Sequence, residues 1–294
     1  MIQADRIPVN DVLGEGVIWD RQTAQFWWTD IEARRLYRYD PRRQQVSSQE
    51  TPFRLASFAL IENDERLLAA FDRGIALFDL DSGRVDWLVG PSAGDDGIRF
   101  NDGRVDRNGV FCVGTMLETA AAPAHSAALY RLQVNGALEE LIGGISISNG
   151  LAWSPDGRRM YHADSPTSTI SVGEYTGQGT ARAARRRFAE VSPEASPDGA
   201  SVDCQGRLWS ALWGAGAVAC FSETGKELFR LDVAAKQPTC VAFGGADLDQ
   251  LLVTSASIGL DSASAETQGA AFLYRVNTPG VADARAVQAY TRAL

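Results

Sequence analysis

Short apolar runs, each followed by a turn signal and a second apolar run, recur along the whole chain. One copy begins at Asn149, passes through the turn Asp156-Gly157 and continues into residues 159–163. Apolar runs of about five residues between turn signals are typical of β-strands. Successive copies are separated by roughly 41 to 49 residues. Their equivalent positions are Glu15, Phe58, Asn101, Asn149, Asp198 and Thr239.

This spacing predicts one four-stranded blade of a β-propeller for each copy. A further strand follows each of the six positions at a similar offset, as in residues 36–40 and 128–132. The apolar pattern contains no amphipathic helix longer than two turns. We therefore expect an all-β fold, a six-bladed β-propeller that forms a single domain over residues 1–294 around a central channel.

Composition excludes several classes of protein. The net charge of −9 disfavours binding to nucleic acid or to an anionic membrane. No run approaches the roughly 18 apolar residues of a membrane span, and the N-terminus lacks the regions of a signal peptide. None of the four cysteines lies in a Cys-x-x-Cys pair, which favours free thiols. We expect a cytoplasmic protein without a nucleic-acid or membrane partner, and the sequence does not indicate the oligomeric state.

Polar residues at the innermost strands indicate where the chemistry lies. In a propeller these strands line the channel, so Glu15, Asn101, Asn149 and Asp198 should converge on the axis. Asn-Gly and Asp-Gly pairs also mark hairpin turns, but a separate turn pair already follows Asn101, Asn149 and Asp198. Buried carboxylates and amides would be costly without a partner, and a divalent cation satisfies them together.

The ligand types narrow the choice of metal. The chain has two histidines, His125 and His162, so a three-histidine zinc site is impossible. Oxygen ligands favour hard cations such as Ca²⁺ or Mg²⁺. The sequence thus predicts a central channel that contains a metal ion held mostly by oxygen.

Several long motifs in the same order resemble the senescence marker protein/regucalcin/gluconolactonase family. They are residues 13–19 (LGEGVIW), 99–106 (RFNDGRVD), 147–157 (ISNGLAWSPDG) and 196–203 (SPDGASVD). The resemblance extends over essentially the whole chain. It implies a six-bladed propeller with one divalent metal ion, and a sugar lactonase that resembles gluconolactonase.

The resemblance also implies roles for individual residues. The family's metal ligands fall on Glu15, Asn149 and Asp198, and its substrate-contacting residues fall on Arg99 and Asn101. Glu118, in the loop after the Gly-Thr-Met sequence of residues 114–116, is a further expected substrate contact. Calcium is the expected metal, with zinc, magnesium, manganese and iron as alternatives. The role of Asp102 is left open.

The expected reaction is hydrolysis of a sugar lactone to the sugar acid, with the metal ion polarising the lactone carbonyl. Asp198 is the candidate catalytic residue, either as general base or as the ligand that positions water. Two alternatives remain open, because a fold does not fix a function. The chain could be a calcium-binding regulatory protein without catalysis, or a hydrolase of other activated esters or organophosphates.

Overall fold

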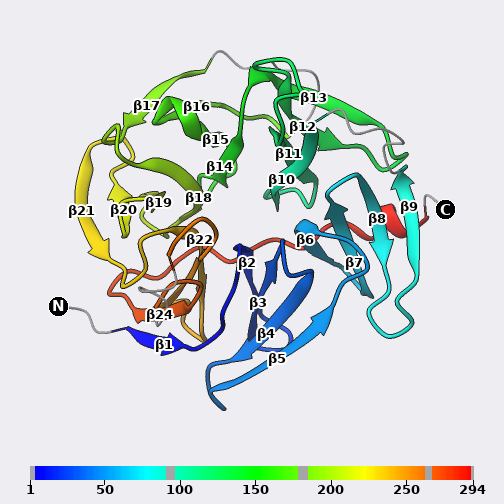
Figure 1. Ribbon diagram of the computed structural model, residues 1–294, viewed down its shortest axis with the longest axis horizontal. Coiled ribbons are helices and arrows are strands. Elements are labelled where there is room, and N and C mark those ends of the chain that lie inside the picture. The colour runs from blue at the N-terminus through cyan, green and yellow to red at the C-terminus, as the bar shows by residue number, and fades with distance from the viewer. Residues whose placement is uncertain (1–3, 91–96, 178–184, 262–266, 293–294) are drawn as a thin grey trace.

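Six four-stranded antiparallel sheets are arranged around a central axis, here called the channel, in the computed structural model of the chain (Figure 1). The structure describes residues 4–90, 97–177, 185–261 and 267–292. These residues contain no α-helix, and within them no helix is long and apolar enough to cross a membrane. The predicted six-bladed β-propeller is therefore confirmed.

The first three blades follow one another along the chain, each with its first strand innermost. Blade 1 comprises β2 (Gly14–Asp20), β3 (Gln25–Asp30), β4 (Arg35–Asp40) and β5 (Gln45–Glu50). Blade 2 comprises β6 (Leu55–Ile61), β7 (Asp64–Phe71), β8 (Gly74–Phe78) and β9 (Val85–Val89). Blade 3 comprises β10 (Ile98–Val105), β11 (Phe111–Leu117), β12 (Ala127–Leu132) and β13 (Leu138–Ile145).

The last three blades complete the circle, and the sixth includes a strand from the N-terminus. Blade 4 comprises β14 (Ser148–Trp153), β15 (Arg159–Asp164), β16 (Thr169–Glu174) and β17 (Arg186–Glu190). Blade 5 comprises β18 (Ser196–Val202), β19 (Leu208–Trp213), β20 (Ala217–Phe221) and β21 (Glu227–Asp232). Blade 6 comprises β22 (Pro238–Gly244), β23 (Gln250–Ser255), β24 (Ala271–Arg275) and β1 (Asp5–Ile7). Because β1 pairs antiparallel with β24, the two ends of the chain close the ring.

A bulge interrupts the pairing of the innermost strand in every blade. In β2 the register shifts between Glu15 and Ile18, and in β14 it shifts between Asn149 and Ala152. A bulge bends its strand and redirects a side chain. Gly16 and Gly150 occupy two of these bulges with φ of +62° and +63°, a conformation that glycine adopts without steric cost. The Asn-Gly pair at residue 149 thus belongs to a strand bulge and not to a hairpin turn.

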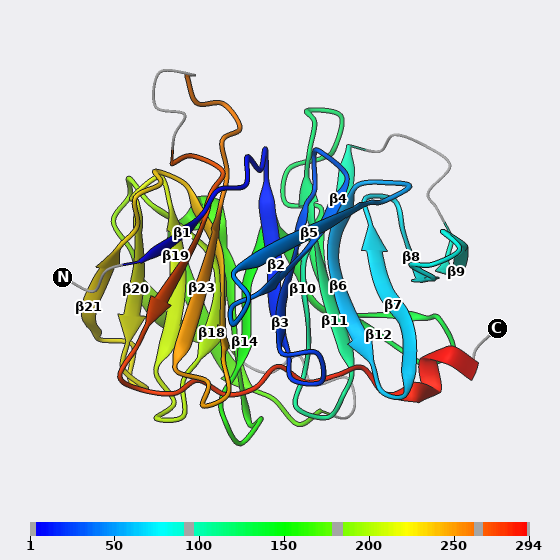
Figure 2. The same cartoon turned by 90° about the horizontal axis from the view of Figure 1, so that it is seen from below.

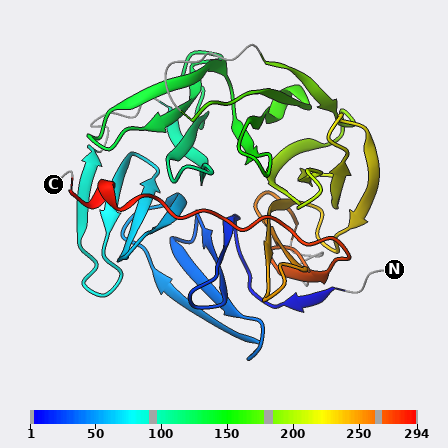
Figure 3. The ribbon, with the colours of Figure 1, turned by 180° about the vertical axis from the view of Figure 1, so that it is seen from behind.

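Residues 276–292, which we call the C-terminal strap, run across one end of the channel (Figures 2 and 3). The strap ends in a short 3₁₀ turn, η3 (Gln288–Arg292), and a second such turn, η1 (Ser165–Thr167), follows β15. Backbone hydrogen bonds join the strap to blade 5 at Val202 and to blade 2 at Leu60. The strap therefore lies across the ring at the end opposite the first residues of the innermost strands.

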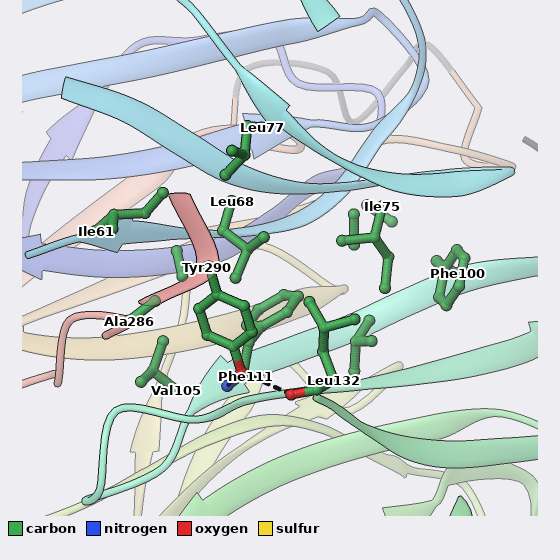
Figure 4. Close-up of a cluster of buried hydrophobic side chains, with 14 of the residues drawn as sticks. Ile61, Leu68, Ile75, Leu77, Phe100, Val105, Phe111, Leu132, Ala286 and Tyr290 are labelled. Atoms are coloured by element: carbon green, nitrogen blue, oxygen red, sulfur yellow. Dashed lines mark hydrogen bonds between the residues drawn. The ribbon is translucent and has the colours of Figure 1, made fainter. Parts of the chain in front are cut away.

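The apolar core between blades 2 and 3 includes part of this strap. Leu68, Ile75 and Phe111 pack with Ala286 and Tyr290, which are almost completely buried (Figure 4). Burial of this apolar surface favours the closed ring by the hydrophobic effect. The strap is thus an integral part of the packed core.

Candidate active site

Four side chains from four innermost strands converge on the channel, and we call Glu15, Asn101, Asn149 and Asp198 the channel cluster. All four are buried, with 5–9% of their surface exposed. They come from β2, β10, β14 and β18, near the strand ends opposite the strap. These residues hold equivalent positions in successive copies of the sequence pattern, and they therefore also hold equivalent positions around the channel.

Hydrogen bonds fix the two amides of the cluster. Asn101 donates from Nδ2 to Oδ1 of Asn149 at 2.9 Å and to the carbonyl of Ser148 at 3.0 Å. Asn149 donates from Nδ2 to Oγ of Ser165 at 2.9 Å, and Ser165 donates in turn to the carbonyl of Pro197. The orientation of Asn149 is thereby set, and a carbonyl-type oxygen retains a second lone pair for another partner.

The two carboxylates of the cluster repel one another. Burial, followed by the charge of Asp102, raises the pKa of Glu15 to about 8. Burial, followed by the charges of Glu15 and Asp102, raises the pKa of Asp198 well above its usual range. The charges of Arg99 and Arg104 oppose the shift of Glu15 without cancelling it, and both arginines form ion pairs with other carboxylates. A cation at the cluster would relieve this repulsion.

The donor set of the cluster fits a hard divalent cation. Glu15 and Asp198 offer carboxylate oxygens, each with one oxygen already bonded to the N–H of the following glycine. Asn149 offers an amide oxygen, and calcium and magnesium prefer such ligands. Within the described residues no group of three or more His, Cys, Asp or Glu side chains is arranged to hold a metal ion. The predicted ligands Glu15, Asn149 and Asp198 do not make up such a group, because Asn149 supplies an amide in place of a third acidic side chain.

Arg99 and Glu118 lie at the entrance side of the cluster. The Arg99 guanidinium donates from one terminal nitrogen to Oδ1 of Asn101 at 2.9 Å, whereas its buried Nε donates no hydrogen bond to any residue that the structure describes. Oε1 of Glu118 lies 3.4 Å from that Nε. Arg54 is hydrogen-bonded to Glu118, and this contact, ahead of the charge of Arg99, lowers the pKa of Glu118. The structure thus brings Arg99, Asn101 and Glu118 together beside the predicted ligands.

A second charged layer, which sequence reasoning did not identify, lies between the cluster and the strap. Asp102 is buried and accepts a hydrogen bond from the backbone N–H of Leu151 at 3.0 Å. Burial raises the pKa of Asp102, and the charge of Arg104 opposes that shift. Arg104 pairs with Asp283 of the strap at 2.8 Å. Asp102 and Arg104 belong to the family motif at residues 99–106, but no sequence signal points to Asp283.

The histidines lie outside the channel cluster. His162 is buried, with Nε2 placed 3.0 Å from Oγ of Ser148 and Nδ1 placed 3.4 Å from Arg185. Burial, followed by the charge of Arg185, lowers the pKa of His162 to about 3. His125 lies next to Ser146 in a loop. His162 is therefore a neutral side chain that forms structural hydrogen bonds.

Two cavities lie away from the cluster. One, of about 1210 Å³, is lined by residues that include Arg107 and Arg158. The other, of about 340 Å³, is lined by residues that include Asp20 and Trp27. Because neither is lined by a member of the channel cluster, the site is identified by the convergence of polar side chains and not by cavity size.

The sequence profile of the SMP-30/gluconolactonase/LRE-like region matches residues 13–257. The chain belongs to the SMP-30/gluconolactonase/LRE-like family. It is 36% identical over 279 residues to the L-arabinolactonase of Azospirillum brasilense, with 94% of this chain and 92% of the relative covered. It is 36% identical to the 6-deoxy-6-sulfogluconolactonase of Pseudomonas putida, with 92% of this chain and 94% of the relative covered.

A solved structure supports the same family assignment. The calcium-binding protein regucalcin from Agrobacterium tumefaciens superimposes with a TM-score of 0.87 at 28% identity, with 96% of each chain covered. The predicted resemblance to this family is therefore confirmed. The matched residues 13–257 include the channel cluster, Arg99 and Glu118, whereas the C-terminal strap lies beyond them.

Proposed function

We propose that this member of the SMP-30/gluconolactonase/LRE-like family is a sugar lactonase that uses the channel cluster as a metal-dependent active site. The observation that carries the proposal is the convergence of Glu15, Asn149 and Asp198 in a buried channel beside Arg99. Further support comes from relatives named L-arabinolactonase and 6-deoxy-6-sulfogluconolactonase, each 36% identical.

Glu15, Asn149 and Asp198 would hold a divalent cation, and calcium is the cation that we propose. Support comes from their oxygen donors and from the structural relative described as a calcium-binding protein. When bound, the cation would polarise the lactone carbonyl and stabilise negative charge on its oxygen.

The side chains around the proposed metal site have separate roles in the proposed reaction. Hydrolysis adds the oxygen of water to the carbonyl carbon, breaks the ring C–O bond and moves a proton to the departing ring oxygen. Asp198 is the candidate acceptor of the water proton, a role that competes with metal binding because a bound carboxylate is a weaker base. Arg99, whose Nε faces Oε1 of Glu118 at 3.4 Å, would orient sugar hydroxyls, as would Asn101 and Glu118.

A second candidate function follows from the regucalcin relative. A protein that only binds calcium could use the same oxygen donors without turning over a lactone. The two candidates differ in a measurable way, since a regulatory protein would bind calcium tightly and leave every lactone intact.

The test is a pH-indicator assay of acid release from several aldonolactones. Metal-stripped protein should be inactive, and restored calcium should return activity. Asp198→Asn should lower kcat/KM by about 100-fold or more. Asp156→Asn, which changes an exposed turn carboxylate, should leave it unchanged. Near-normal turnover by the Asp198→Asn variant would refute the proposed role, and calcium binding without turnover of any lactone would favour the regulatory candidate.

A further inference from the structure

Arg104 spans the channel between the cluster and the strap. It belongs to β10 of blade 3, and its buried guanidinium donates to the carbonyl of Val17 in blade 1 at 3.2 Å and to the carbonyl of Val241 in blade 6 at 3.3 Å. A single side chain thus connects three blades across the axis. Asp102 lies in the bulge of the same strand, two residues before Arg104, and the charge of Arg104 acts on its carboxylate.

Asp283 holds this guanidinium from the strap side. Its Oδ1 accepts a hydrogen bond from Arg104 at 2.8 Å, and its Oδ2 accepts one from the backbone N–H of Trp19 at 3.0 Å. The exposed fractions of the two side chains are 9% for Arg104 and 11% for Asp283. A buried ion pair of this kind leaves a costly unpaired charge when one partner is removed.

Without Asp283, the guanidinium would have the channel carboxylates as its remaining anionic partners. The charge of Arg104 already stabilises the ionised forms of Asp102 and Glu15, which places all three within electrostatic range of one another. A cation that moves toward Glu15 would compete with a divalent ion for the same oxygens.

We propose that Asp283 is a positioning residue that retains Arg104 at the strap end of the channel, so that the channel cluster stays available to a divalent cation. This inference rests on the metal site of the proposed function. It assigns a role to the C-terminal strap, which Asp283 links to Arg104 of β10.

The test measures calcium affinity by calorimetric titration of metal-stripped protein, so it does not depend on activity. Asp283→Asn keeps the shape of the side chain and removes its charge, and we expect calcium affinity to fall by about 10- to 100-fold. Adding Arg104→Met in the same chain removes the competing cation and should return the affinity to that of the unmodified protein. A purely structural role for Asp283 would predict no such recovery.

Arg285→Met provides a matched control on the same strap. Arg285 pairs with Asp20 at 2.6 Å and donates to the carbonyl of Ile61, away from the cluster. Asp20 keeps its hydrogen bonds from Gln22 and Thr23 when Arg285 is lost. This control should lower the melting temperature and leave calcium affinity unchanged.

Three results would overturn the inference. They are unchanged calcium affinity in Asp283→Asn, an equal loss in Arg285→Met, and no recovery in the double variant. If Asp283→Asn does not fold, Arg104→Met alone decides, because the inference requires it to bind calcium at least as tightly as the unmodified protein. Absence of calcium binding by the unmodified protein would refute the proposed metal site, and this inference with it.

Discussion

Replacing Tyr290 with Phe removes one buried hydroxyl group from the C-terminal strap. This hydroxyl donates to the carbonyl of Leu132 at 2.7 Å and accepts from the N–H of Phe111 at 3.2 Å. All three residues are buried, so the variant leaves two backbone groups without this partner. At about 1–3 kcal/mol for each of the two buried groups left unpaired, we expect a loss of about 2–6 kcal/mol. For a chain of this length the unfolding entropy is about 0.6 kcal/mol/K, so Tm should fall by about 3–10 °C.

Tyr161→Phe is the matched control for this prediction. Tyr161 is also fully buried, but among the described residues its hydroxyl has no hydrogen-bond partner. Removing an unpaired buried hydroxyl should leave Tm unchanged or raise it. Calorimetric scans of both variants in one buffer test the comparison. An unchanged Tm in Tyr290→Phe, or equal losses in the two variants, would refute the argument that the strap is held by these hydrogen bonds.

Two further predictions concern a bulge and the buried histidine. Gly16→Ala and Gly83→Ala each place alanine at positive φ without a close contact, and each should lower the free energy of unfolding by about 1–2 kcal/mol. Only Gly16→Ala, which is next to Glu15, should weaken calcium binding in a calorimetric titration. Equal calcium affinities in the two variants would contradict this. The pKa of His162 is lowered to about 3 in the folded protein. The unfolded chain therefore binds a proton at higher pH than the folded protein does, and stability falls as pH drops below about 6.5. When the pH falls from about 7.5 to about 4.5, the free energy of unfolding measured in urea should therefore decrease by about 2–3 kcal/mol less in His162→Gln than in the unmodified protein. Identical pH dependence in the two proteins would contradict this.

The periodic pattern of the sequence was sufficient to predict the propeller. Strand length and turn chemistry are local properties, and each of the six marked positions lies on an innermost strand. The structure brings Arg99, Asn101 and Glu118 together next to Asn149, and their roles as substrate contacts stay a prediction from the family motifs. The bulges are partly visible in the sequence, because Gly16 and Gly150 supply the positive φ that they require.

Electrostatic coupling inside the channel could not be predicted from the same pattern. The raised pKa values of Glu15 and Asp198 depend on burial and on mutual distance, and Asp102 contributes to both. Sequence phase indicates that side chains share a channel, but it does not give their solvent exposure or their separation. These quantities are needed before a cation can be argued from charge repulsion.

The amino-acid sequence by itself determined the all-β fold, the six copies and the polar positions that face the channel, because each depends on residues close together in the chain. Only the tertiary structure decided how the ring closes and what lies beneath the cluster. β1 joins β24 across nearly the whole chain, and Arg104 meets Asp283 at a separation of 179 residues. Contacts over such separations leave no periodic trace in a single sequence, since they arise when packed blades bring distant segments to one axis.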